Sequence, residues 1–124
     1  EHIHIGRAFR RLTHENLLVI GSGFSFHNMK AFFSSETSES KTQNEAFEHW
    51  LADTCTSQQI DEEERTKRLV HWSSAPSARY CHPREEHLLP LHVCYGVAGS
   101  YCSERFDLRI LNKKTSMYLW EPKS

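Results

Sequence analysis

A short, continuous apolar run bounded by glycines is the feature that most restricts the fold of this chain. Residues 17–20 read Leu-Leu-Val-Ile, and Gly21 and Gly23 follow them. A run of this length between turn residues is typical of a strand buried on both faces, as in a parallel sheet covered by helices. Before it, residues 3–12 have the spacing of an amphipathic helix. We therefore expect an α/β protein with an open, mostly parallel sheet flanked by helices.

The rest of the chain predicts further helices, a polar loop and two strands. Residues 34–44 are rich in Ser, Thr and Glu and predict a loop, after which Asn44 is expected to cap a helix that continues to about Asp53. The remaining elements are expected at residues 61–68 (helix), 91–98 (buried helix ending near Gly99), 106–110 (strand) and 116–120 (strand).

Length and charge restrict the classes of partner. The chain has 124 residues, which suits a single domain, and its 15 basic and 16 acidic side chains give a formal charge of -1. This balance argues against a nucleic-acid partner, and no apolar run reaches the length of a membrane span. The first residues lack the pattern of a signal peptide, so we expect a cytoplasmic protein.

The four cysteines form no recognisable metal or redox motif. Cys55, Cys81, Cys94 and Cys102 contain no C-x-x-C spacing, and the chain has no N-x-S/T glycosylation site that would indicate secretion. We therefore expect reduced thiols that serve mainly in packing.

The nine histidines are the most informative chemical feature. No two of them have the i,i+4 spacing that places two metal ligands on one helix face. His82, His87 and His92 follow one another at intervals of five residues, which turns them about 140° apart on an ideal helix. These three cannot form a metal site without residues from elsewhere.

His27 has the most favourable position among the histidines. It follows Gly23 by four residues, in the loop that leaves the predicted buried strand. Ligands and catalytic groups of open α/β sheets gather beyond the carboxyl ends of the strands. His87 precedes the buried helix and is expected to reach the same crevice, with His82 nearby. The alternative interpretation is that these histidines are ordinary surface or core residues.

Two long segments resemble a known enzyme family. Residues 17–32, which contain His27, and residues 82–92, which contain His82 and His87, are similar to signatures of the class III extradiol ring-cleavage dioxygenases. The most similar branch is that of the 4,5-DOPA dioxygenases. The resemblance covers nearly the whole chain, but it corresponds only to the C-terminal portion of a family member. The family's N-terminal half, with its G-H-G-S-P loop, is absent from residues 1–124.

The resemblance implies a metal-dependent oxidation. It assigns His27 and His87 to a metal site that holds non-haem Fe(II), or zinc at the same nitrogens. It also assigns acid/base chemistry to His27 and a place in the substrate pocket to His82. The implied reaction opens a catechol ring beside its diol with dioxygen and gives a semialdehyde.

Two assigned ligands are fewer than the three that a catalytic metal needs. We therefore expect the chain alone to be inactive, to bind metal weakly, and to self-associate or pair with the absent N-terminal half. Two alternatives stay open. One is a truncated, non-catalytic remnant that serves as a binding or assembly module, and the other is a generic α/β domain with incidental histidines.

Overall fold

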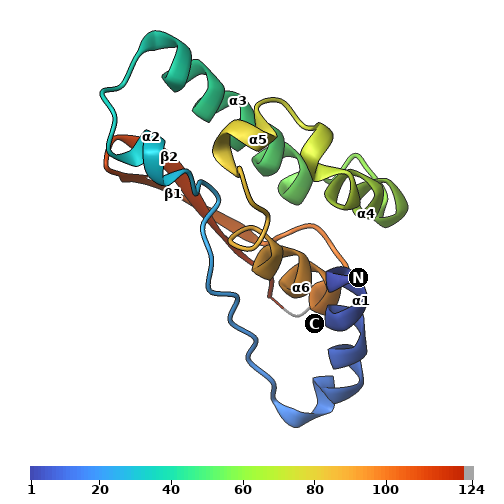
Figure 1. Ribbon diagram of the computed structural model, residues 1–124. Coiled ribbons are helices and arrows are strands. Elements are labelled where there is room, and N and C mark those ends of the chain that lie inside the picture. Colours follow the sequence, from blue (N-terminus) through green and yellow to red (C-terminus); the bar gives the residue numbers. More distant parts are fainter. Residues whose placement is uncertain (122–124) are drawn as a thin grey trace.

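The computed structural model describes residues 1–121, except for the side chains of Thr13 and His14. Figure 1 shows α3, α4 and α5 together on one side, α1 beside α6 at the other end, and a β-hairpin running past both groups. The elements in chain order are α1 (His2–Phe9), the 3-10 helix η1 (Arg10–Glu15), α2 (Met29–Phe32), α3 (Ser38–Thr56), α4 (Glu62–Val70), the 3-10 helix η2 (Trp72–Ser74), α5 (Ala78–Cys81), α6 (Leu89–Ala98), β1 (Glu104–Ile110) and β2 (Lys113–Leu119).

The predicted helices at residues 3–12 and residues 91–98 are confirmed. Residues 3–12 fall within α1 and η1, and α6 contains residues 91–98 and is capped by Gly99. Pro90 lies in the first turn of α6, where its missing N–H is not needed. None of the helices in residues 1–121 combines the length and the apolar character needed to cross a bilayer.

The polar segment before residue 44 forms part of a helix instead of the predicted loop. Thr37 caps α3 by accepting a hydrogen bond from the backbone N–H of Ser40, and the Ser40 side chain accepts one from the N–H of Thr37. This reciprocal capping box places the N-cap of the helix seven residues before Asn44. Asn44, expected as the cap, lies inside α3 and is buried against the hairpin, where its amide bonds to both backbone groups of Lys114.

The two C-terminal strands form an antiparallel hairpin. Their register pairs Glu104 with Leu119 at one end and Ile110 with Lys113 at the other. The turn residues Leu111 and Asn112 have φ values of 49° and 66°. Positive φ at both positions is the geometry of a two-residue turn whose twist matches the strands. Both predicted strands are confirmed. Each begins before its predicted range, and β2 ends at Leu119, one residue before the predicted end.

The prediction of a buried strand at residues 17–20 is wrong. These residues lie outside any helix or strand, and the side chains of Leu18 and Ile20 are 78% and 79% exposed. A strand is stable only when its backbone pairs with neighbours, and no neighbouring strand in the described chain lies against this segment. The described residues therefore show a mixture of helices and strands but no parallel sheet, and their sheet has only β1 and β2.

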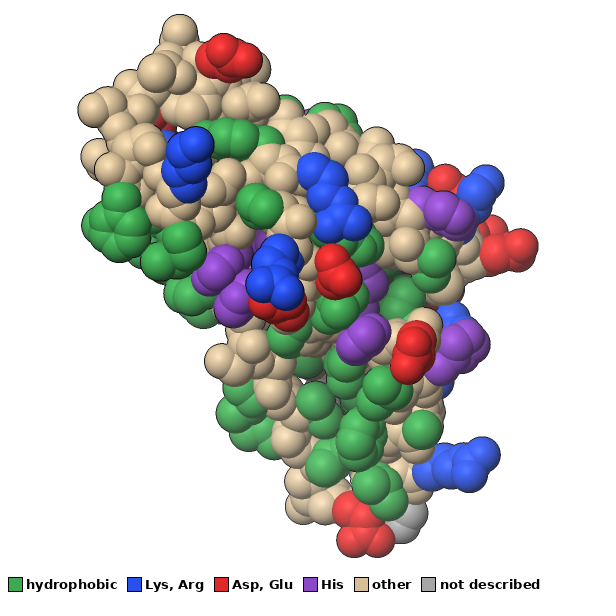
Figure 2. All heavy atoms as spheres, in the orientation of Figure 1, with side chains coloured by type: hydrophobic (Ala, Val, Ile, Leu, Met, Phe, Trp, Pro, Cys, Tyr) green, Lys and Arg blue, Asp and Glu red, His purple; other side chains and the backbone are tan. Residues whose placement is uncertain are grey.

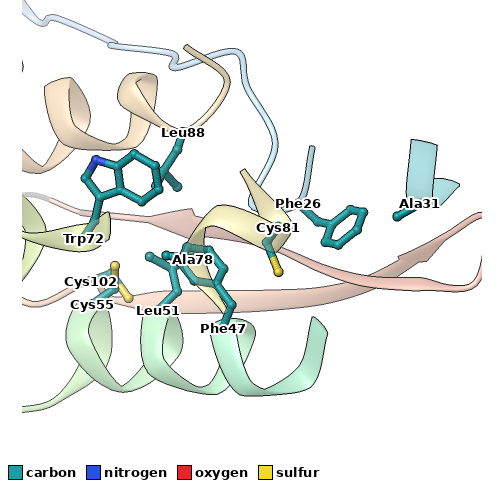
Figure 3. Packing of buried hydrophobic residues seen from close by; sticks show 10 residues of the cluster. All are labelled: Phe26, Ala31, Phe47, Leu51, Cys55, Trp72, Ala78, Cys81, Leu88 and Cys102. Carbon is teal, nitrogen blue, oxygen red and sulfur yellow. The ribbon is translucent and has the colours of Figure 1, made fainter. Parts of the chain in front are cut away.

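The main core lies between α3, α5 and the start of the hairpin. Figure 3 shows its buried side chains, which come from segments distant in sequence: Phe26, Ala31, Phe47, Leu51, Cys55, Trp72, Ala78, Cys81, Leu88 and Cys102. A smaller cluster of Ile3, Leu69 and Tyr95 joins α1, α4 and α6. The core thus fixes residues 26, 81 and 88, each of which adjoins a histidine predicted to be functional.

Two glycines set how closely α1 and α6 approach each other. A Cβ atom on Gly6 would overlap the carbonyl oxygen of Val93, and one on Gly96 would overlap that of Ile3. The helices are therefore in backbone contact at this crossing, and a side chain at either position would force them apart.

We expect Gly96→Ala to lower the free energy of unfolding by about 1–3 kcal/mol, because the new methyl group pushes α1 away from α6. Urea unfolding followed by circular dichroism measures the change. Lys41→Ala, at an exposed position of α3, is the control and should stay within about 0.5 kcal/mol of the parent chain. An unchanged or raised stability of Gly96→Ala would show that the crossing is not tightly packed.

Candidate functional site

The structure brings His27 and His87 into direct contact. Their ring centroids are 3.5 Å apart and the ring planes are inclined by only 16°, so the two imidazoles are stacked. Both side chains are half-buried. Partial burial, together with the neighbouring His87, lowers the pKa of His27 below its ordinary value. His27 is therefore neutral at neutral pH and can accept a proton.

Hydrogen bonds between residues 24–28 and residues 80–87 hold the two histidines together, and we call this set the His27 junction. Asn28 also caps α2 by accepting a bond from the N–H of Ala31, so the loop after His27 is fixed on both sides. The bonds of the junction are Phe24 N–H to His87 O (2.9 Å), His27 N–H to Cys81 O (2.9 Å) and Asn28 Nδ2–H to Tyr80 O (2.7 Å).

His82 supports the same junction from inside the protein. Its ring is fully buried, and its Nε2 lies 2.7 Å from the backbone oxygen of Ser25. Because a carbonyl only accepts hydrogen bonds, Nε2 carries the proton, and the buried Nδ1 has no partner among the described residues. Burial lowers the pKa of His82 to about 4. His82 is thus a neutral donor that orients the backbone two residues before His27.

Sequence reasoning missed a buried polar network beyond Ser25. The hydroxyl oxygen of Ser25 accepts a bond from the N–H of Ser116 (2.8 Å), and the hydroxyl of Ser116 donates to Glu48 (2.6 Å). Burial raises the pKa of the Glu48 carboxyl. The network ties the His27 junction to α3 and β2. No sequence signal could have revealed it, because its members lie far apart in the chain and share no motif.

A large groove begins beside His87, and we call it the edge groove. It has a volume of about 820 Å³ and is lined by residues 17–25, residues 116–121 and one side of α6. Within the described chain its lining includes His87, but neither His27 nor His82. Figure 2 shows hydrophobic side chains gathered on the lower half of the molecule, where Figure 1 places α1 and α6, with histidines above them.

His27 and His87 are of the residue type that binds a metal ion. Their number and the orientation of their rings, however, do not make a complete metal site. Neutral imidazoles such as those of His27 and His87 suit Fe(II) and zinc. Stacked rings, however, hold their in-plane lone pairs in nearly parallel planes, so the two nitrogens do not converge on one point without a ring rotation. No group of three or more His, Cys, Asp or Glu side chains in the described residues is placed to hold a metal. The described chain offers two donors and not a complete site.

Comparison with known proteins shows several related dioxygenases. The chain is 35% identical to the dioxygenase tasH of Hapsidospora irregularis, over 78% of this chain and 32% of that protein. It is 33% identical to 4,5-DOPA dioxygenase extradiol of Mirabilis jalapa and 31% identical to that of Beta vulgaris, over 79% of this chain and 34% of each relative.

This chain resembles part of an extradiol dioxygenase. The resemblance inferred from the two histidine segments is therefore confirmed, and the chain spans about a third of the length of the curated relatives it matches. No family model matches the chain. No solved structure matches it either.

His82 makes a specific contribution to the pH dependence of stability. The unfolded chain binds a proton at His82 near pH 6.5, whereas the folded protein does so only near pH 4. Protonation in this interval favours the unfolded state, so the free energy of unfolding falls as the pH is lowered from 6.5 towards 4. We expect His82→Asn to lose less stability over this interval than the parent chain does.

Urea unfolding at several pH values between these limits measures the effect. The difference between parent and variant isolates His82 from the other titrating groups. His49→Asn, on the exposed face of α3, should keep the dependence of the parent chain. An identical pH dependence in His82→Asn and the parent would show that His82 is not held neutral by burial.

Proposed function

We propose that this chain is the C-terminal portion of an extradiol dioxygenase that opens a catechol ring, of the DOPA type, with dioxygen. The observation that carries the proposal is the stacking of His27 on His87, because it joins the histidines of both dioxygenase-like segments across 60 residues of chain. The names of these relatives, both dioxygenases, support the same reaction class.

In the proposed enzyme, His27 and His87 are two ligands of a non-haem Fe(II), and zinc could occupy the same nitrogens. Such a metal supplies redox chemistry between an electron-rich ring and dioxygen, which zinc cannot. Among the side chains that the structure describes, no other His, Cys, Asp or Glu joins the pair, so the proposal requires at least one further ligand from another part of the enzyme.

The two histidines predicted to be catalytic receive different roles. His27 is neutral and half-buried, and a neutral imidazole has one basic nitrogen, so His27 could either hold the metal or take a proton from a bound phenol, but not both at once. His82 was expected to line the substrate pocket, but its ring is fully buried behind Ser25. We therefore assign it a positioning role, in which its bond to Ser25 sets the backbone that leads to His27.

The edge groove supports the proposal that a further part of the enzyme packs against this chain. One wall is the exposed apolar segment 17–20, and the other includes the edge of β2 that faces away from β1. Exposed apolar residues beside an open strand edge are typical of a surface that another segment covers. We propose the N-terminal half of the dioxygenase as that segment.

Oxygen uptake with DOPA and with unsubstituted catechol, after anaerobic loading with Fe(II), tests the proposal. The 124-residue chain should show no turnover above the free-metal background. A chimera in which this chain replaces the matching third of the Mirabilis jalapa enzyme should consume oxygen and form a yellow ring-opened product. Turnover by the short chain would contradict its predicted inactivity.

Variants of the chimera test the residue roles. His27→Ala and His87→Ala should each reduce turnover to background, because each removes a ligand, whereas His49→Ala should retain the activity of the parent chimera. An active His87→Ala variant would exclude the assigned metal site. If the chimera folds but does not consume oxygen, the non-catalytic remnant becomes the better interpretation, with the edge groove as its assembly surface.

A further inference from the structure

Two cysteines meet where α3 ends and the hairpin begins. Cys55 lies in the last turn of α3 and Cys102 lies two residues before β1. The backbone N–H of Cys102 donates to the backbone oxygen of Cys55 over 2.8 Å. Figure 3 shows their thiols next to each other, at one end of the main core. Both are free thiols in the structure.

The backbone hydrogen bond by itself places the two residues within reach of a disulfide. Its length is 2.8 Å. Adding the N–Cα bond on one side and the Cα-to-oxygen span on the other gives a Cα–Cα separation of at most about 6.7 Å, even if all atoms lay on a line. Disulfides join residues whose Cα atoms are about 4.4–6.8 Å apart. The main chain would therefore need little movement to accommodate the bond.

The burial of Cys55 and Cys102 favours slow and selective oxidation of these two thiols. Cys55 is fully buried and Cys102 is 4% exposed, so Cys102 meets solvent first when the start of the hairpin opens. Burial raises the pKa of Cys102 to about 11 and raises that of Cys55 further. Fewer thiolates form at neutral pH, which protects both sulfurs from general alkylation.

We propose that Cys55 and Cys102 form an intramolecular disulfide when a low-molecular-weight disulfide, such as oxidised glutathione, is in excess. The Cys102 thiolate attacks one sulfur of the small disulfide, which gives a mixed disulfide and releases one small thiol. The Cys55 thiolate then displaces the second small thiol. The protein loses two electrons and two protons, and the small disulfide gains them.

The cross-link has a structural consequence that is independent of the proposed dioxygenase activity. It ties the end of α3 covalently to the start of β1 and closes a loop of nearly 50 residues. Closing a loop of this size in the unfolded chain stabilises the folded state. Because β2 pairs with β1, the bond also fixes one wall of the edge groove relative to α3.

The 124-residue chain is incubated with oxidised glutathione or with reduced glutathione, and free thiols are then blocked before mass spectrometry and peptide mapping. Before blocking, we expect the oxidised chain to be lighter by two hydrogen atoms. After unfolding in urea and blocking, it should carry two fewer blocking groups than the reduced chain and yield a linked peptide pair containing Cys55 and Cys102. Its melting temperature should rise by roughly 5–15 °C and fall back after reduction with dithiothreitol.

Matched serine variants separate this pair from the other thiols. Cys102→Ser should lose both the linked peptide and the rise in melting temperature, whereas Cys94→Ser, at a half-buried position of α6, should keep both. Linkage through Cys81 or Cys94, or stable glutathione adducts without a cross-link, would overturn the proposal. The proposal would also be overturned if oxidised glutathione left the mass of the folded parent chain unchanged but oxidised the same chain in urea.

Discussion

The arrangement of this molecule depends on the His27 junction. The apolar side chains of residues 17–24 are largely exposed, although Gly21 and Gly23 lie close to Pro90 and Phe26 is part of the main core. The backbone bonds from Phe24 and His27 to the 80–87 segment add directional constraints to these contacts. The histidine pair is therefore a product of main-chain pairing, and its two rings meet because their backbones are already aligned.

Buried polar groups make this alignment specific. His82, Ser25, Ser116 and Glu48 are each at least 92% buried, and leaving any of them without a partner would be costly in the interior. Each bond in the series constrains the next, so the position of Ser25 is set from the 80s segment, from α3 and from β2 at once. Apolar packing alone would tolerate small shifts of the loop at Ser25 relative to α3 and β2. The hydrogen-bond network does not tolerate them.

The sequence predicted those parts of the fold that local rules determine. The amphipathic pattern of residues 3–12, the proline and glycine that delimit α6, and the alternation of residues 106–110 depend on near neighbours, and all three were interpreted correctly. The strand prediction for residues 17–20 is wrong because an apolar run shows only that a segment can be buried. It does not show that a partner strand is present. The α3 start was missed because Ser and Thr favour loops and helix caps alike.

The candidate site was predictable to the extent that its residues lie in recognisable segments. The approach of His27 to His87 was predicted from a loop beyond a buried strand and from the family resemblance, but residues 17–20 form no strand, so only the resemblance remains as a valid argument. The burial of His82 could not be foreseen, because it depends on Phe47 and Trp72 packing against its ring from two different helices. Nor could the sequence indicate Glu48, whose role arises only when α3 lies against the hairpin.

The side chain of Asn44 acts on β2 as a substitute for a neighbouring strand. Its amide satisfies both backbone groups of Lys114, and the hydroxyl of Ser25 satisfies the N–H of Ser116 on the same edge. Alternate residues of a strand direct their backbone to the same side, so Tyr118 is the next position on this edge, in the part that borders the groove. Half of the edge is thus blocked by side chains. Because these backbone groups are already bonded, only a short strand could pair with the rest of the β2 edge. This disfavours the continuous strand pairing between molecules that produces fibrils.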